Sequence, residues 1–383
     1  MSSPAFRCEV YDKNFALKGT VGNPISVTII PKHMTPGMTT IVVPGDQARV
    51  ADLIQPGARM WFKDYQTDDH LMSGWVARYR VRGPGNRSQI EFDIIDDLIV
   101  FQRILGWVVP TGAITEQGTA GTNWTMTGAA ETVLKAALQQ NGVDRLGLPI
   151  SIPASQGRGS TVKGKLRFQS LYDRLIPVED GAGIINSGIG IGMQQNPNAP
   201  GLLFNVWTPR TIPQVLTEDS SVVTNWSMNH QGATMTRGVA GGAGEAQLRL
   251  LREKVDAALE ASLGWKMEQF RDARDTDDPN VMYERIDETL LENAARSGLS
   301  VELSEAKNFI ARPGKIWVGD QVTMGLAGQL ITDRLHEVTL SWTASEGKVT
   351  RPRIGDWSDD PDRKLARIVR NITRKLRIAN EPA

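Results

Sequence analysis

Alternating apolar and polar positions dominate the first hundred residues, and this period of two is typical of half-buried β-strands. Residues 89–95 show it most clearly, since Ile90, Phe92 and Ile94 alternate with polar side chains. Turn signals rich in glycine and proline separate the apolar runs. The sequence predicts strands at residues 6–11, 26–30, 39–43, 59–63, 71–82 and 88–95. Strands this short and this regularly spaced indicate a small antiparallel barrel.

Helical periodicity follows this β region. The first helix is expected to bury one apolar face, made of Val133, Leu134, Ala137 and Leu138. Thr127 is the candidate N-cap of this helix, and Gly142 is its candidate stop. Ser170, with Asp173 three residues later, is expected to open a second helix at residues 171–178.

A glycine-rich segment at residues 181–192 and a strand at 202–207 come next, and these elements together predict an α/β insertion. After a further β segment, the glycine run 238–244 precedes a charged stretch, 245–262, which is expected to begin as a helix. Three more strands are expected at residues 299–303, 316–324 and 336–343, with a tight turn or bulge at Gly319-Asp320.

Another helix is expected to begin at Asp278-Pro279, which is a good N-cap and first-turn pair. Gly298 is its candidate stop. Its apolar positions recur every four residues: Met282, Ile286, Leu290 and Ala294.

The last segment differs from the rest because it is basic and amphipathic. Asp360-Pro361 is expected to start a helix there. Its candidate docking residues are Leu365, Ile368, Val369, Ile372 and Leu376 on the apolar side, with Arg367, Arg370 and Arg374 among the basic side chains. Such a helix can lie on an anionic membrane or on nucleic acid, but its short apolar stripe favours docking against a partner protein or another subunit.

The sequence therefore predicts an α+β multidomain chain with two small antiparallel β-barrel domains, α/β insertions and a C-terminal amphipathic helix. The first barrel is expected at residues 1–108 and the α/β insertion at 109–215. The second barrel, with a helical insertion at about 245–300, is expected at 216–350, and the basic helix and tail at 351–383.

Composition narrows the function. Lys plus Arg and Asp plus Glu both number 43, so no global charge attracts nucleic acid or an acidic membrane. Cys8 is the only cysteine, which excludes an internal disulfide and fits assembly in a reducing cytoplasm. Neither a signal peptide nor a run long enough to span a bilayer is recognisable, so no stable membrane insertion is expected.

Two polar constellations invite ligand-binding interpretations that the sequence does not favour. The glycine run 238–244 lacks the Gly-Lys-Ser/Thr ending of a phosphate loop, and Glu245 would repel a phosphate, so a packed turn is favoured. The acidic run 272–278 misses the order of an EF-hand. Ion pairing with the interleaved Arg271 and Arg274, and helix capping by Asp278, explain it better than a metal. No cofactor and no metal are expected.

No enzyme signature stands out. The four histidines are His33, His70, His230 and His336, and they lie far apart without a nucleophile nearby in the sequence. Cys8, in an expected strand, is interpreted as a buried inert thiol. Five of the ten tryptophans fall in expected strands: Trp61, Trp75, Trp207, Trp317 and Trp342. They are interpreted as core or interface anchors, with an aromatic sugar-binding platform as the alternative.

Several segments carry a family resemblance. Gly241-Gly-Ala-Gly-Glu245, the run 268–276 and the return 298–303 resemble the tail-hub (minor tail) proteins of siphoviruses that infect actinobacteria. Residues 71–95, followed by Asp97-Leu98 and 107–110, look like the end of the first barrel of those proteins. The order of elements matches over nearly the whole chain.

The resemblance implies a structural hub at the virion tail tip, assembled in the host cytoplasm and related to contractile-tail baseplate hubs. Three subunits would form a ring in which two barrel-like domains each give pseudo-sixfold symmetry, joining a sixfold tail tube to threefold tip proteins. The implied partners are two further copies of the chain, distal tail and tail-tube proteins, the tape measure protein and other tip proteins. Phage DNA would pass through the gated channel without sequence-specific binding.

Two other classes of function stay open at this point. A tail-tip peptidoglycan hydrolase would need a catalytic site that the sequence hides, and a carbohydrate-binding tip module would use surface tryptophans. The chain ends soon after its last expected strand, without the lytic or receptor-binding extension that longer hubs carry. The expectation is therefore a structural protein rather than an enzyme.

Overall fold

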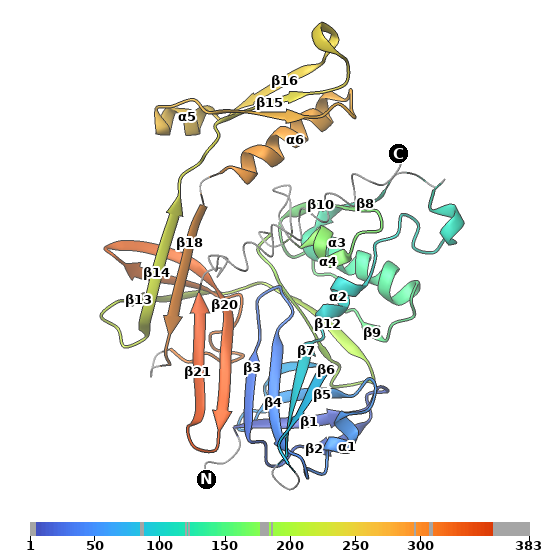
Figure 1. Cartoon of the computed structure of the whole chain (residues 1–383), viewed down its shortest axis with the longest axis vertical. Helices are drawn as coiled ribbons and strands as arrows, with labels where there is room; N and C mark the ends of the chain where they lie inside the picture. Colours follow the sequence, from blue (N-terminus) through green and yellow to red (C-terminus); the bar gives the residue numbers. More distant parts are fainter. Residues whose placement is uncertain are drawn as a thin grey trace. The chain divides into compact units, whose positions relative to one another are not determined.

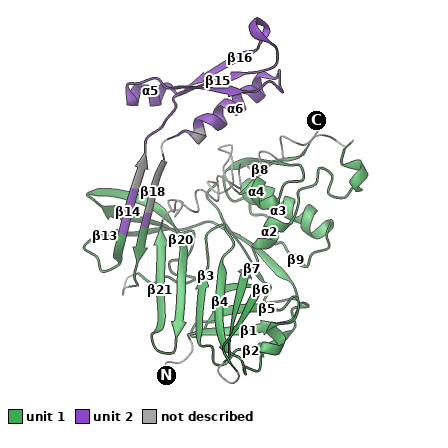
Figure 2. Cartoon of the chain, viewed as in Figure 1, with its two compact units in different colours: residues 1–178, 182–225, 301–354 green, residues 179–181, 226–300, 355–383 purple. Residues whose placement is uncertain are grey.

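The structure is a computed structural model that describes residues 5–84, 88–118, 121, 123–176, 184, 187–294, 296–305 and 309–354. Most of its regular structure is β-strand. The chain forms two compact units (Figure 2). Unit 1 comprises residues 1–178, 182–225 and 301–354, and unit 2 comprises 179–181, 226–300 and 355–383. The domain limits expected from the sequence remain a prediction.

The N-terminal part of unit 1 is an antiparallel β region with one short helix, α1 (Val50–Leu53). Its strands are β1 (Phe6–Tyr11), β2 (Leu17–Thr20), β3 (Ser26–Ile30), β4 (Met38–Pro44), β5 (Arg59–Asp64), β6 (His70–Arg82) and β7 (Gln89–Asp96). All six expected strands are confirmed within a residue at each end, and β2 is an additional one. In β7, Ile90, Phe92 and Ile94 are buried, as the alternation predicted.

The C-terminal β region of unit 1 joins the same sheet. Its strands are β13 (Thr211–Thr217), β14 (Val223–Gln231), β18 (Arg296–Leu303), β19 (Gln321–Leu326), β20 (Gln329–Thr343) and β21 (Gly347–Ile354), of which β14 and β18 also contribute residues to unit 2. The hydrogen-bonded order runs β14-β18-β21-β20-β3-β4-β7-β6-β5-β1-β2, with β19 on β20 and β13 on β19 (Figure 1). The expected strand at 316–324 begins later, at Gln321, because Gly319, with φ +94°, lies in a tight turn before it.

The two separate closed barrels expected from the sequence are not found among the described residues. The order of strands is open at β2 and β14, and β3 pairs with β20 in a register that sets Ile29 opposite Leu340 and Val27 opposite Trp342. All four side chains are buried. Period-two patterning marks the buried face of each strand but not its partner, and the actual pairing merges the two β regions into one sheet.

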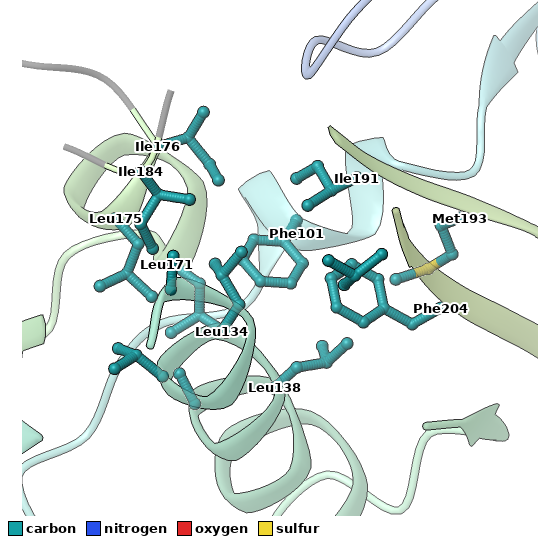
Figure 3. Packing of buried hydrophobic residues seen from close by; sticks show 14 of the residues in the cluster. Phe101, Leu134, Leu138, Leu171, Leu175, Ile176, Ile184, Ile191, Met193 and Phe204 are labelled. Carbon is teal, nitrogen blue, oxygen red and sulfur yellow. The ribbon is translucent and has the colours of Figure 1, made fainter. Parts of the chain in front are cut away.

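The α/β part of unit 1 surrounds its own hydrophobic core. Its elements are α2 (Ile99–Arg103), η2 (Ile114–Glu116), β8 (Trp124–Ala129), α3 (Ala130–Leu138), the π-helical η3 (Gln139–Asp144), β9 (Ile150–Ser151), β10 (Thr161–Leu166), α4 (Leu171–Leu175), β11 (Gly190–Gln195) and β12 (Leu202–Trp207). The apolar face of α3 is fully buried, as expected. It packs beside Phe101 and Phe204, whose rings stack with centroids 5.5 Å apart (Figure 3).

Two details of the expected first helix are wrong. Thr127 is not its cap, because it lies in β8 and pairs with Lys163 of β10. Gly142 is not its stop, because the helix continues through it as a π-helical turn. The expected start of the second helix is confirmed, since the Ser170 side chain accepts a hydrogen bond from the Asp173 amide.

Unit 2 contains a three-stranded sheet with one long helix. Its elements are β15 (Arg237–Gly241), η5 (Ala246–Leu248), β16 (Leu251–Val255), α5 (Ala257–Leu263), β17 (Glu268–Asp272) and α6 (Pro279–Glu292). The strand order is β16-β15-β17, with β17 parallel to β15. The charged stretch after Glu245 is thus a turn, a strand and only then a helix. No apolar–polar alternation marks this strand, because Glu253 lies on the same side as Leu251 and Val255.

The expected start of α6 is confirmed and its expected stop is wrong. The Asp278 carboxylate accepts a hydrogen bond from the Asn280 amide, which caps the helix. Met282 and Ile286 are buried and Leu290 packs against them. Gly298, however, lies within β18, and α6 ends at Glu292.

The expected basic helix after Asp360 lies outside the described residues, together with all its candidate docking residues. Among the residues that are described, no helix has the length and apolar character needed to cross a bilayer.

Candidate functional site

Of the residues with catalytic potential, Cys8 and His33 are buried and His70 is half-buried. Cys8 is fully buried in β1, and burial raises the pKa of its thiol to about 12. His33 is buried beside His336, with ring centroids 6.4 Å apart, and burial lowers the pKa of its imidazole to about 3. His70 accepts a hydrogen bond from the Trp61 indole nitrogen at 2.8 Å. These groups are held as a neutral thiol and neutral imidazoles inside the sheet, which does not activate a nucleophile.

The acidic run 272–278 is engaged in ion pairs and caps. Asp275 forms a two-pronged pair with Arg285 of α6, and this pairing lowers the pKa of its carboxyl. Asp272 pairs with Arg249 and more loosely with Arg274. Over the described part of the chain, no cluster of three or more His, Cys, Asp or Glu side chains has the geometry to hold a metal ion.

A buried polar network joins the first β region to the α/β part of unit 1. Asp97 lies directly after β7, is fully buried and pairs with Arg59 of β5 at 2.5 Å. Its other oxygen accepts a hydrogen bond from Ser73 of β6 at 2.7 Å, and the Ser73 hydroxyl accepts one from the Gln195 amide of β11. Burial raises the pKa of Asp97, and the Arg59 charge opposes this. The network fixes β11 against β6.

A second anchor lies where the C-terminal β region meets the segment after β12. Asp320 is buried and accepts hydrogen bonds from the Arg210 side chain at 2.7 Å and from the Arg210 and Trp317 amides at 3.0 Å each. Arg210 also donates to the carbonyls of Gly314 and Lys315. One arginine therefore ties the turn at residues 314–320 to the start of β13.

The tryptophans divide between these cores and the surface. Trp61 and Trp342 are buried, and Trp75, Trp207 and Trp317 are half-buried. Trp317 lies just before β19 rather than in a strand. Trp265, between α5 and β17 of unit 2, is 70% exposed.

One face of the unit 2 sheet is exposed and built by regular structure. The helix α6 covers the other face, where Gly238 and Ala240 lie against Ile286 and Met282 (Figure 1). From the strand registers, the uncovered side carries three rows of three residues: Leu251, Gly241 and Asp272; Glu253, Val239 and Phe270; and Val255, Arg237 and Glu268. We call these nine residues the open face.

The open face mixes exposed apolar groups with acids. Leu251 and Phe270 are 55% and 53% exposed, which is unusual for large apolar side chains in a sheet. Arg249 lies over the Phe270 ring, 5.2 Å from its centroid, and also pairs with Asp272. Arg237 pairs with Glu253 at 3.1 Å and with Glu260 of α5 at 2.7 Å. Both arginines on this side are thus engaged with carboxylates.

Sequence analysis missed the open face. Residues 241–245 and 268–276 are separate motifs in the sequence, yet in the structure Gly241, the last residue of β15, lies opposite Asp272, the last residue of β17. Residues 251–255 have three consecutive charged residues between Leu251 and Val255, so no alternation marks β16, and the stretch was expected to begin as a helix. None of the candidate docking residues of the C-terminal segment can be placed, because they lie outside the described part.

Two solved structures with a similar fold are tail proteins. The chain is similar to the 43 kDa tail protein of prophage MuSo2 from Shewanella oneidensis, with a TM-score of 0.53 and 8% identity over 91% of this chain and 98% of that one. It is also similar to a tail protein from Neisseria meningitidis MC58, with a TM-score of 0.50 and 12% identity over 93% and 98%. At this identity the likeness establishes a shared fold, that of phage-type tail proteins.

The family follows from the sequence itself. Residues 7–356 match the model of the family described as Siphovirus ReqiPepy6 Gp37-like protein, and the chain belongs to this family. The siphovirus resemblance expected from the sequence motifs is confirmed. No curated protein matches the chain.

Proposed function

We propose that the protein is the structural hub of a siphovirus tail tip. Three copies would form a ring in which the two β regions of each copy supply two of six positions, joining a sixfold tail tube to threefold tip proteins. The observation that carries this proposal is the family match over residues 7–356, and the tail-protein fold supports it.

Contacts between segments far apart in sequence hold unit 1 together, as expected for a ring subunit that transmits force. The pairing of β3 with β20 connects residues near the two ends of the described chain. The Asp97 and Asp320 networks connect elements that are far apart in sequence, since Asp97 reaches Gln195 through Ser73 and Asp320 holds Arg210. A subunit that transmits force between neighbours needs such cross-links, because separately packed parts would slide.

A hub at the tail tip would contact the proteins on both sides of it, and these are the proposed partners. They are distal tail and tail-tube proteins, the tape measure protein and other tip proteins, with DNA passing through the ring during ejection. The zero formal net charge is consistent with a channel wall that DNA passes without being held. A ring of three uses a heterologous, closed interface, so two different surfaces of each copy must be complementary.

Carbohydrate binding is the competing function, and Trp265 is the observation that favours it. An exposed indole is the group that stacks on sugar rings, and Trp265 is the most exposed tryptophan described. A glycan array with the purified chain tests this alternative, with Trp265→Ala as the matched variant. Binding to a cell-wall sugar that this substitution abolishes would replace the hub proposal with a binding module.

The mass of the purified chain in solution tests the hub directly. Light scattering over a concentration series, with negative-stain images of the same sample, is expected to give three times 42.0 kDa, about 126 kDa, and threefold rings. A stable dimer at every concentration, or a monomer at the highest soluble one, contradicts the ring.

A further inference from the structure

Among the described residues, no helix or strand packs on the open face of unit 2. Four members of the open face are apolar, and Val239 on the central strand is in the middle of them. Phe270 lies opposite Val239 on β17, and Leu251 and Val255 lie diagonally from it on β16. Three of these four are exposed. Adjacent apolar side chains on an uncovered sheet mark a place where another element packs.

The charges around this apolar patch select a basic occupant. Glu253 and Glu268 of the open face pair with Arg237, which also pairs with Glu260 of α5, and Asp272 pairs with Arg249 and Arg274. Four carboxylates therefore face three arginines, so this face keeps an excess of acid. Residues 226–300 as a whole contain thirteen Asp and Glu against nine Lys and Arg. A basic amphipathic segment would therefore gain both apolar burial and favourable electrostatics here.

The chain itself supplies such a segment. Residues 363–377 contain seven Lys and Arg and no acid, with Leu365, Ile368, Val369, Ile372 and Leu376 at helical spacing. Ile354, the last residue of β21, pairs with Val301 of β18. Val301 is the residue at which the chain returns from unit 2. The eight residues from 355 to 362 form a linker that reaches roughly 26 Å when extended.

The apolar stripe of the C-terminal segment and the open face have similar lengths. The apolar stripe from Leu365 to Leu376 covers eleven residue steps, roughly 17 Å along a helix. The five-residue strands of the open face are roughly 16 Å long, and three strands are roughly 10 Å wide between their outer axes. A single helix is about 10 Å in diameter, so one helix of this length covers the apolar patch.

We propose that the C-terminal segment 363–377 docks as an amphipathic helix on the open face of unit 2. Its apolar stripe packs on Val239, Leu251, Val255 and Phe270, and its basic side chains lie against Glu253, Glu268 and Asp272. The three-stranded sheet then has a helix on each side, α6 and the C-terminal helix. This proposal does not depend on the ring or on the proposed tail function.

Site-directed photo-cross-linking on the full chain tests the docking. Cys8 is buried, so an engineered surface cysteine is the one accessible thiol among the described residues. Glu268→Cys, on the open face, is labelled with a benzophenone maleimide and irradiated, and the cross-linked peptides are identified by mass spectrometry. Links to residues 363–377 are expected. Leu330→Cys, on an exposed position of β20 in unit 1, is the control and should give none.

Two variants with the same added charge distinguish docking through the apolar stripe from non-specific electrostatic attraction between the basic segment and unit 2. Ile368→Asp/Ile372→Asp breaks the apolar stripe and should lower the cross-link yield about tenfold, which corresponds to about 1.4 kcal/mol. Asn371→Asp/Thr373→Asp adds the same charge off the stripe and should change the yield by less than about threefold, since exposed charges are screened. Links only to other segments, no links at all, or an equal loss in both variants would overturn the proposal.

Amide hydrogen exchange on the same variants gives an independent measurement. Strands β16 and β17 should exchange faster in the Ile368→Asp/Ile372→Asp chain than in the Asn371→Asp/Thr373→Asp chain, because the first has lost its cover. Equal exchange rates in the two variants would also overturn the docking.

Discussion

Arg59 and Asp97 form an ion pair that is buried from solvent on both sides, with 2.5 Å between the guanidinium nitrogen and the carboxylate oxygen. Arg59 also lies over the Phe15 ring, 4.6 Å from its centroid. Through Ser73, Asp97 is connected to Gln195 of the α/β part. The first β region and the α/β part of unit 1 therefore share one charged centre, and loss of that centre should destabilise both.

Asp97→Ala should lower the free energy of unfolding of unit 1 by about 3–5 kcal/mol, because the Arg59 charge is left buried without its partner. Denaturant unfolding followed by tryptophan fluorescence measures this. Glu302→Ala is the control, since Glu302 pairs with Arg353 at an exposed position, and it should cost less than about 1 kcal/mol. Similar losses in both variants would show that the Asp97 network does not support the fold.

The neighbouring carboxyl, Asp96, should make stability depend on pH. Burial raises the pKa of Asp96 to about 7, and the adjacent Asp97 charge adds to this, against hydrogen bonds from the Leu98 and Gly37 amides. Because the pKa is raised in the folded state, the stabilisation is complete below the unfolded value near 4 and is lost as pH rises through about 7.

Asp96→Asn should remove this dependence. Between pH 4 and pH 8 the unmodified chain should lose about 1–2 kcal/mol more than the variant, a modest figure because Asp96 is only half-buried by accessible surface. Urea midpoints at several pH values measure the difference. Parallel pH profiles for the two chains would rule out a raised pKa at Asp96.

Local patterns predicted the elements of unit 1 better than their assembly. The strands at 6–11 and 26–30 follow from period-two alternation alone, and Ser170 marks a helix start because its cap is a contact over three residues. The pairing of Ile29 with Leu340 depends on which strands meet, and a single sequence holds no record of that. Hence two barrels were expected where one open sheet is found.

The same limit applies to helix caps and to the open face. Thr127 of unit 1 and Gly298 of unit 2 have the right chemistry for a helix cap and a helix stop, but β-pairing with β10 and inclusion in β18 override it. The open face depends on three strands in one register, two of them rich in charge. Only after β15, β16 and β17 are aligned do Leu251, Val239 and Phe270 become neighbours.

Gly238 allows α6 to approach β15 closely, so a methyl group there should loosen the helix. A Cβ at this position would lie 2.5 Å from the Cγ2 of Ile286 and 2.7 Å from the Cε of Met235. Ile286 is β-branched and cannot move its methyl group without shifting α6. Gly238→Ala should therefore destabilise unit 2 by about 1–3 kcal/mol.

Amide exchange in α6 and β15 is the measurement for this variant, and faster exchange is expected in both elements. Gly232→Ala is the matched control, because a Cβ there meets nothing within 4 Å. Unchanged exchange in Gly238→Ala would show that the helix is not seated against this strand.

The Cys8 thiol should be unreactive until the sheet opens. Cys8 is fully buried between the β2 and β5 partners of β1, and burial holds its pKa at about 12, so little thiolate is present at pH 8. An aromatic disulfide reagent at pH 8 should react with it more than about a hundredfold faster in denaturant than in native buffer, as an opening free energy of about 3 kcal/mol requires. Glu268→Cys provides the exposed comparison, which should react at once in native buffer and leave one slow thiol. Two equally fast thiols in the native variant would mean that β1 is not held in the sheet.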